Sequence, residues 1–115
     1  MKDEFLDYVE DVLKAMDDAS TFVRGMNYDS FVKDRKTVYA VIRALEIIGE
    51  ATKNIPTPIK ARYPEIPWKD IVGMRDKVIH AYFGVDLKRV WSTVNVDIPA
   101  IKPCFEKLLK DNEKR

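Results

Sequence analysis

The sequence has little cysteine, histidine or glycine: one, one and four residues among 115. The lone Cys104 cannot form an intrachain disulfide, and the lack of a cysteine–histidine cluster excludes a structural zinc site. Arg43 interrupts the best apolar run well short of membrane-spanning length. Residues 1–7 form an acidic segment that lacks the apolar core of a secretory signal peptide. We therefore expect a cytoplasmic protein that needs no metal or other cofactor and does not enter a membrane.

The net charge is only +1, so no bulk positive field attracts nucleic acid to the whole surface. Any contact with RNA must therefore come from a local patch. A content of 46% hydrophobic and 34% charged residues, with few glycines and prolines, is typical of a folded, helix-rich protein. At this length we expect one domain spanning residues 1–115.

Apolar residues recur at three- and four-residue steps over residues 3–24 and 30–53, which predicts one half-buried helix in each range. Gly25 follows the first helix as a C-terminal breaker. The apolar arc of the second helix is wider than one bundle face needs, which indicates a further partner surface on another helix or another subunit. Four of the six prolines fall in residues 54–67, which predicts a loop with one short turn over residues 58–63.

The second half of the chain predicts further helices. One starts near Pro67 and stops before Gly84. Asp86 should cap the next helix, and Pro99 should kink or split it because proline removes a backbone donor. The basic residues 107–115 are expected to form a frayed, solvated end.

The stretch from Gly73 to Gly84 contains the only histidine, His80, with Arg75 five residues before it and Tyr82 two residues after it. Arginine is a fixed cation whose planar donors suit phosphate. Imidazole can give or take a proton near neutral pH. A phosphate-binding group and a proton-transfer group this close together indicate phosphodiester chemistry.

On a straight helix Arg75 lies near the centre of the apolar face, whereas His80 projects about 140° away, on the polar edge. Either the long arginine side chain bends back, or the helix end tilts His80, or the working pair is assembled across two chains. Without catalysis, Arg75 would form an internal ion pair with Glu46 or Glu50, and His80 would be a surface histidine at a helix end. The residues alone leave these alternatives open.

The pattern Arg75-x4-His80-x-Tyr82 resembles the Arg-x(4–6)-His signature of the HEPN superfamily, in the form found in HepT-type toxins, and residues 47–51 and 83–87 agree with it. The resemblance covers nearly the whole chain. It implies an all-α fold, a HEPN-type four- to five-helix up-and-down bundle. It also implies a metal-independent RNA endonuclease that acts as a homodimer, with the two motif helices facing each other across the dyad in one shared cleft.

On this resemblance Arg75 and His80 are the catalytic pair, which bind the scissile phosphate and transfer protons respectively. Asp76 would orient a motif side chain, and Lys77 would contact the RNA backbone. In HepT-like toxins the tyrosine after the histidine can be adenylylated by a small nucleotidyltransferase antitoxin, which implies an MntA-like partner that modifies Tyr82. The alternative is a non-catalytic nucleotide-binding or interaction module that partners a nucleotidyltransferase.

Overall fold

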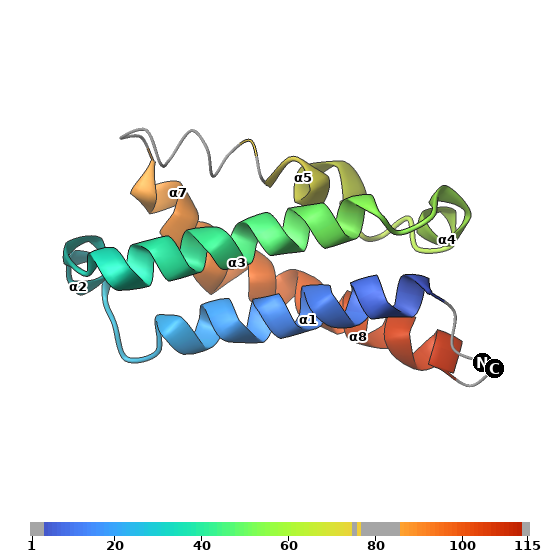
Figure 1. Ribbon diagram of the computed structural model, residues 1–115, viewed down its shortest axis with the longest axis horizontal. Helices are drawn as coiled ribbons and strands as arrows, with labels where there is room; N and C mark the ends of the chain where they lie inside the picture. Colours follow the sequence, from blue (N-terminus) through green and yellow to red (C-terminus); the bar gives the residue numbers. More distant parts are fainter. Residues whose placement is uncertain (1–3, 75, 77–85, 114–115) are drawn as a thin grey trace.

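The computed structural model describes residues 4–74, 76 and 86–113, and these residues form helices and turns without a strand. The bundle is elongated, with extents of 46 × 25 × 22 Å (Figure 1). Two long antiparallel helices, α1 (Phe5–Phe22) and α3 (Arg35–Lys53), lie side by side along its length. The predicted all-α fold is confirmed. Among the described residues, no helix is long and apolar enough to cross a membrane.

The core centres on α1, which packs against both α3 and α8 (Ile98–Glu113) through its apolar stripe. The first helix agrees with the prediction to within two residues at each end. Gly25 follows it with a φ of 79°, a conformation that glycine adopts without strain from a Cβ atom. The fully buried side chains include Leu6, Val9, Val12, Phe31, Val41, Leu45, Ile48, Phe105 and Leu108.

The single helix predicted over residues 30–53 is wrong, because the chain forms two helices there. α2 (Tyr28–Lys33) starts earlier than predicted, behind a capping box formed by Asn27. The Asp34 carboxylate then accepts a hydrogen bond from the Thr37 N–H at 3.1 Å and caps α3. A short polar side chain that bonds to the backbone in this way separates two helices that would otherwise be continuous.

The wide apolar arc on α3 is divided between the core and the surface. Ala44 and Ala51 are buried, and Ile47 is half-buried against the core. Tyr39, by contrast, is 49% exposed. Internal burial therefore explains part of the arc, and the first turns of α3 keep an aromatic ring at the surface.

Residues 54–67 form the predicted loop, which contains one short helix, α4 (Thr57–Ala61), close to the expected turn. α5 (Trp68–Val72) follows the loop directly and packs against α3. The proline-rich segment therefore connects the end of α3 to the helix that precedes the Arg75–His80 motif.

The last helices follow one another without a loop. α7 (Leu87–Ser92) leads into a π-helix, η1 (Thr93–Asp97), and then into α8. The first residue of α8 donates its N–H to the carbonyl of Thr93, five residues back. Pro99 accounts for this change because it has no N–H to give to the carbonyl of Asn95. The disturbance expected at Pro99 thus takes the form of a π-helical turn.

The frayed end expected over residues 107–115 is wrong as far as Glu113, where α8 ends. Asn112 is buried, and its amide donates to the Tyr63 hydroxyl at 3.2 Å. That hydroxyl donates to the Asp111 carboxylate at 2.9 Å. Burial and the Asp111 carboxylate together raise the pKa of Tyr63. These bonds hold the end of α8 against the proline-rich loop.

Replacing Tyr63 by phenylalanine should lower the free energy of unfolding by about 1–3 kcal/mol, because the buried Asn112 amide loses a hydrogen-bond partner. Chemical denaturation followed by circular dichroism measures this change. Tyr39→Phe is the matched control: it removes a hydroxyl that the Arg35 guanidinium bonds at 3.3 Å on the surface. That variant should lose less than about 0.5 kcal/mol. Equal losses in the two variants would contradict a structural role for the Tyr63 network.

Candidate active site

The structure describes Asp76 among the five residues predicted for the site. Asp76 lies in a helical turn and its side chain is exposed. The other four lie outside the described residues: Arg75, Lys77, His80 and Tyr82. The surroundings of the site are therefore defined by α5 and Met74 on the N-terminal side and by Asp86 and α7 on the C-terminal side.

The predicted motif helix is interrupted before the motif begins. α5 ends at Val72, and the Gly73 N–H bonds to the carbonyl of Lys69 at 2.9 Å. Met74 is helical again and buried. The Asp76 N–H bonds to the carbonyl of Gly73 at 3.1 Å, with the three-residue spacing of a tighter 3₁₀ turn. The helix predicted from residue 67 is therefore broken at Gly73.

Trp68 fixes α5 to the bundle. Its indole N–H lies 3.1 Å from the carbonyl of Lys60 and 3.0 Å from that of Tyr63. Its ring meets the ring of Phe105 edge-on, with 5.6 Å between the centroids. The Lys60 ammonium lies over the indole, 5.9 Å from its centroid, and burial there lowers the pKa of Lys60. The approach to the motif is thus attached both to the loop and to α8.

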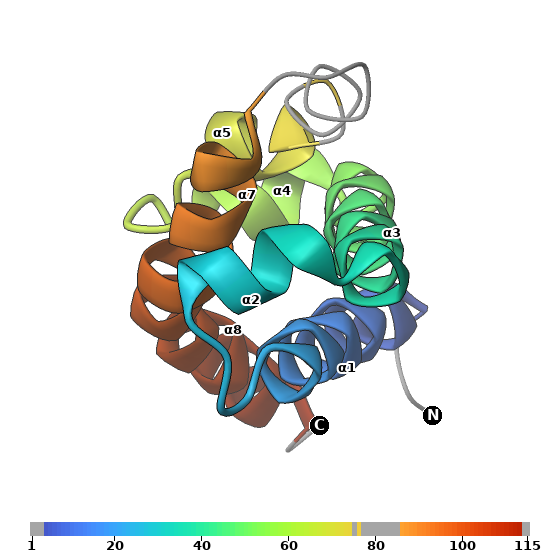
Figure 2. The same cartoon turned by 90° about the vertical axis from the view of Figure 1, so that its left-hand side faces the viewer.

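Asp86 and Trp91 fix α7 at the other side of the motif. The Asp86 carboxylate accepts the Arg89 N–H at 3.0 Å, so the predicted cap is confirmed. The Trp91 ring packs against Phe31 and Tyr28, with centroids 5.1 and 6.3 Å away. These contacts hold α7 against α2, as Figure 2 shows. Both described flanks of the motif are therefore anchored to the same bundle.

A cavity of about 280 Å³ lies between α3, α5, α7, η1 and α8. Its apolar lining includes Leu45, Ile71, Met74 and Val90, and its polar lining consists of Asp70, Arg89, Thr93 and Asp97. Two carboxylates against one guanidinium make this cavity a poor site for a phosphate. Among the described side chains, no group of three or more histidine, cysteine, aspartate or glutamate residues could hold a metal ion.

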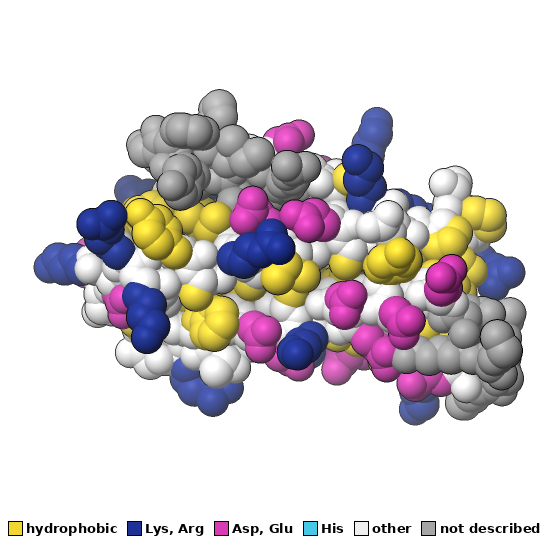
Figure 3. Space-filling view, in the orientation of Figure 1, with side chains coloured by type: hydrophobic (Ala, Val, Ile, Leu, Met, Phe, Trp, Pro, Cys, Tyr) yellow, Lys and Arg dark blue, Asp and Glu magenta, His cyan; other side chains and the backbone are white. Residues whose placement is uncertain are grey.

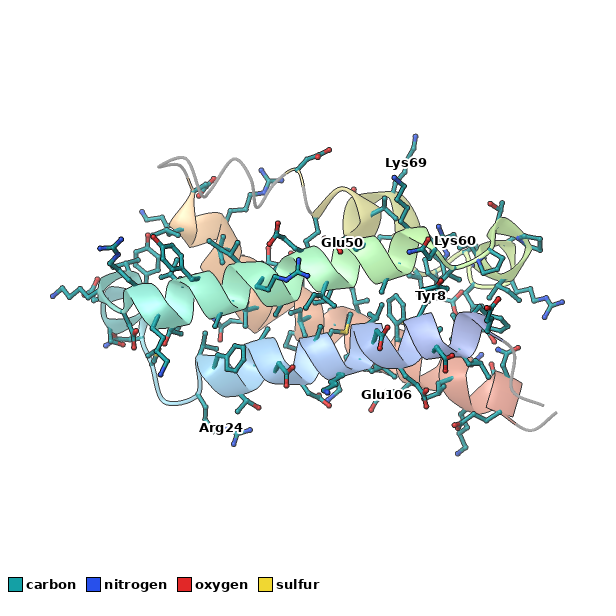
Figure 4. The ribbon with its side chains drawn as sticks, viewed as in Figure 1. Tyr8, Arg24, Glu50, Lys60, Lys69 and Glu106 are labelled. Carbon is teal, nitrogen blue, oxygen red and sulfur yellow. The ribbon has the colours of Figure 1, made fainter. Side chains whose placement is uncertain are left out.

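Glu46 and Glu50, the alternative partners of Arg75, both lie close to Arg43. The Arg43 guanidinium is 3.8 Å from the Glu46 carboxylate and 3.4 Å from that of Glu50. The three side chains are 27–60% exposed, so each pair contributes at most about 1 kcal/mol to stability. Figure 4 shows Glu50 on α3, and Lys69 on α5 pointing away from the bundle. The two acids thus have a cationic partner without Arg75.

Comparisons of the sequence with known proteins point to one family. A family model described as "Ribonuclease HepT-like" matches residues 12–108. The chain is 54% identical over 110 residues to "Probable ribonuclease HepT" of Thermococcus cleftensis, covering 96% of this chain and 100% of that protein. It is 50% identical over 108 residues to a "Putative RNase" of Methanocaldococcus jannaschii, with 94% and 93% covered. It is 40% identical over 103 residues to a "Putative RNase" of Caldanaerobacter subterraneus, with 90% and 92% covered. No solved structure matches the chain.

Proposed function

Because the chain belongs to the HepT-like ribonuclease family, we propose that it is the toxin of a toxin–antitoxin pair and cleaves RNA as a cytoplasmic homodimer without a metal ion. The observation that carries the proposal is Arg75-x4-His80-x-Tyr82 in a chain that matches the family model over residues 12–108. The described flanks support it, because α5 and α7 are both anchored to the bundle on either side of that motif.

Cleavage of RNA through its own 2′-hydroxyl needs a base, an acid and positive charge on the phosphoryl group. The 2′-oxygen attacks phosphorus while His80 of one chain takes its proton. The bond from phosphorus to the 5′-oxygen breaks, and the partner's His80 gives that oxygen a proton. Arg75 of each chain neutralises the charge that grows on the phosphoryl oxygens. The products are a 2′,3′-cyclic phosphate and a 5′-hydroxyl.

Chelation of divalent metal ions should leave the rate of RNA cleavage unchanged, because the base, the acid and the positive charge in this mechanism all come from the protein. The test is cleavage of a short RNA by the purified protein in excess EDTA, with the ends of the products identified by mass spectrometry. We expect 2′,3′-cyclic phosphate ends. Activity that is lost in EDTA and restored by added magnesium would contradict the mechanism.

Asp76 is proposed to orient a motif side chain, and Lys77 to contact the RNA backbone. Replacing Asp76 by asparagine keeps the shape of the side chain and removes its charge. Because Asp76 is exposed, stability should not change, whereas kcat should fall on the order of tenfold with KM nearly constant. Asp70→Asn, another exposed aspartate six residues earlier, is the control and should keep full kcat. Equal kcat values in the two variants would remove Asp76 from the site.

We propose that an MntA-like nucleotidyltransferase antitoxin neutralises the toxin by adenylylating Tyr82. The tyrosine is two residues from His80 and seven from Arg75 in the sequence. An attached AMP places a phosphate and a bulky base beside Arg75, where the RNA phosphate would bind. The modification would thus inhibit cleavage both by charge and by volume.

A further inference from the structure

Positive charge is concentrated where α2, α3 and α7 meet. Figure 3 shows Lys and Arg side chains gathered at this end of the bundle, on the left, and Figure 2 views it face-on. Residues 28–36 and 86–89 contain five cations and three acids, a net charge of +2, so the rest of the chain carries −1. The five cations are all exposed and together are named the basic end: Lys33, Arg35, Lys36, Lys88 and Arg89. Arg24, just past the end of α1, points away from the bundle (Figure 4) and is not part of it.

Two of the three acidic side chains at this end accept hydrogen bonds from backbone N–H groups. Asp34 accepts the Thr37 N–H at 3.1 Å, and Asp86 accepts the Arg89 N–H at 3.0 Å. Both carboxylates thus stabilise helix N-termini. None of the ion pairs between described residues includes a cation of the basic end. These cations can therefore meet an external anion.

Aromatic packing holds the cations of α7 beside those of α2 and the start of α3. Trp91 of α7 contacts Phe31 and Tyr28 of α2, with centroid distances of 5.1 and 6.3 Å. Lys88 lies eight residues after His80 in the sequence, in the first turn of α7. The basic end is thus continuous with the helix that follows the catalytic motif.

Tyr39 adds an exposed aromatic ring to this surface. Its side chain is 49% exposed, and the Arg35 guanidinium lies over its ring, 5.9 Å from the centroid. Proteins that bind single-stranded nucleic acids combine such groups: a base stacks on the aromatic ring, and the neighbouring cations bind the backbone phosphates.

α1 carries the opposite charge. Its 18 residues include five carboxylates and one lysine. A polyanion is therefore repelled from α1 and attracted toward the α2–α3–α7 end, although the protein as a whole is nearly neutral.

We propose that the basic end binds the single-stranded RNA next to the scissile phosphate. Lys33, Lys36 and Lys88 bind backbone phosphates, and Tyr39 stacks with a base. This assignment rests on the proposed ribonuclease function and identifies where that enzyme holds its substrate outside the catalytic motif.

The test uses the full-length His80→Ala protein, which binds RNA without cutting it. The probe is a fluorescein-labelled oligouridine of about 12 nucleotides, within the site sizes known for single strands. Fluorescence anisotropy between about 50 and 200 mM KCl measures the Kd and its salt dependence. Combining Lys33→Ala, Lys36→Ala and Lys88→Ala should weaken binding on the order of tenfold or more. It should also reduce the slope of log K against log salt by about 2, or about 0.7 for each phosphate that the protein no longer neutralises.

The control protein carries three other lysine-to-alanine changes, so its net charge falls by the same amount. The control lysines are exposed and lie outside the basic end: Lys14, Lys53 and Lys110. This variant should lose less than about threefold in affinity, with the salt slope unchanged. Equal losses in the two triple variants would overturn the proposal, since binding would then follow net charge alone.

Tyr39→Ala should weaken binding about fivefold or more without changing the salt slope, because a stacked base contributes no counterion release. Tyr39→Phe keeps the ring and should bind like the parent protein. Identical binding by the alanine and phenylalanine variants would exclude stacking on Tyr39.

A separate cleavage assay with unlabelled RNA distinguishes this proposal from the function on which it rests. If the wild-type protein cleaves RNA and both triple variants bind the probe equally well, the basic end is not the RNA site but the ribonuclease function stands. If the wild-type protein cleaves no RNA, the proposed function fails. If the basic-end variant keeps its RNA affinity but no longer binds the antitoxin, the surface serves a protein partner and the proposal is overturned.

Discussion

Replacing His80 by alanine should reduce RNA cleavage by about 10⁴-fold or more. General acid and general base catalysis each contribute about 10²- to 10⁴-fold, and in the proposed dimer this one substitution removes both. The chain has no other histidine that could replace the imidazole. Initial rates on a labelled RNA, measured beside the wild-type protein, give the ratio directly.

Arg75→Ala should be inactive as well, since the phosphoryl group loses two guanidinium groups in the same dimer. Arg43→Ala is a matched control, because Arg43 is another arginine whose side chain is 60% exposed on α3 and has no proposed contact with RNA. Circular dichroism and size-exclusion chromatography establish that each variant is folded and associated like the parent. Cleavage that survives both Arg75→Ala and His80→Ala would refute the assignment of the catalytic pair.

Tyr82→Phe should escape neutralisation completely. The variant keeps its aromatic ring and the catalytic residues, so it should still cleave RNA, but it has no hydroxyl to accept AMP. Coexpression of the wild-type toxin with its antitoxin should add the mass of one AMP to Tyr82 and permit growth. Coexpression of the variant should leave the mass unchanged and arrest growth.

Tyr39→Phe is the control for that experiment, because it removes an exposed tyrosine hydroxyl elsewhere on the surface. It should be neutralised like the wild-type protein. A wild-type toxin that is fully neutralised but carries no AMP would show that the antitoxin blocks the cleft by forming a complex instead.

The main helices and their buried faces could be predicted from the sequence because a period of 3.6 residues is a strong signal. The break at Asp34 was not predicted, since the apolar stripe of the helix continues across it while a local side-chain hydrogen bond divides the backbone. The ordered end of α8 was not predicted either. It depends on contacts between Asn112 and Tyr63, which are 49 residues apart in the chain.

The residues of the candidate site came from the resemblance to a family, and only Asp76 among them lies within the part of the chain that the structure describes. The structure adds the supports on either side, where Trp68 packs against Phe105 and Trp91 packs against Phe31, because these partners lie in distant segments of the chain. The basic end could not be predicted for the same reason. Lys33, Arg35 and Lys36 are close together in the sequence, but Lys88 and Arg89 join them only because α7 packs against α2.

The central claim is that two chains pool their single imidazoles in one cleft. Mixing wild-type and His80→Ala chains, with time for the subunits to exchange, tests this directly. If cleavage needs both imidazoles, activity follows the square of the wild-type fraction, so an equal mixture keeps about one quarter of the rate of an all-wild-type sample at the same total concentration. If each chain cleaves RNA with its own histidine, the equal mixture keeps about one half, and the shared site is contradicted.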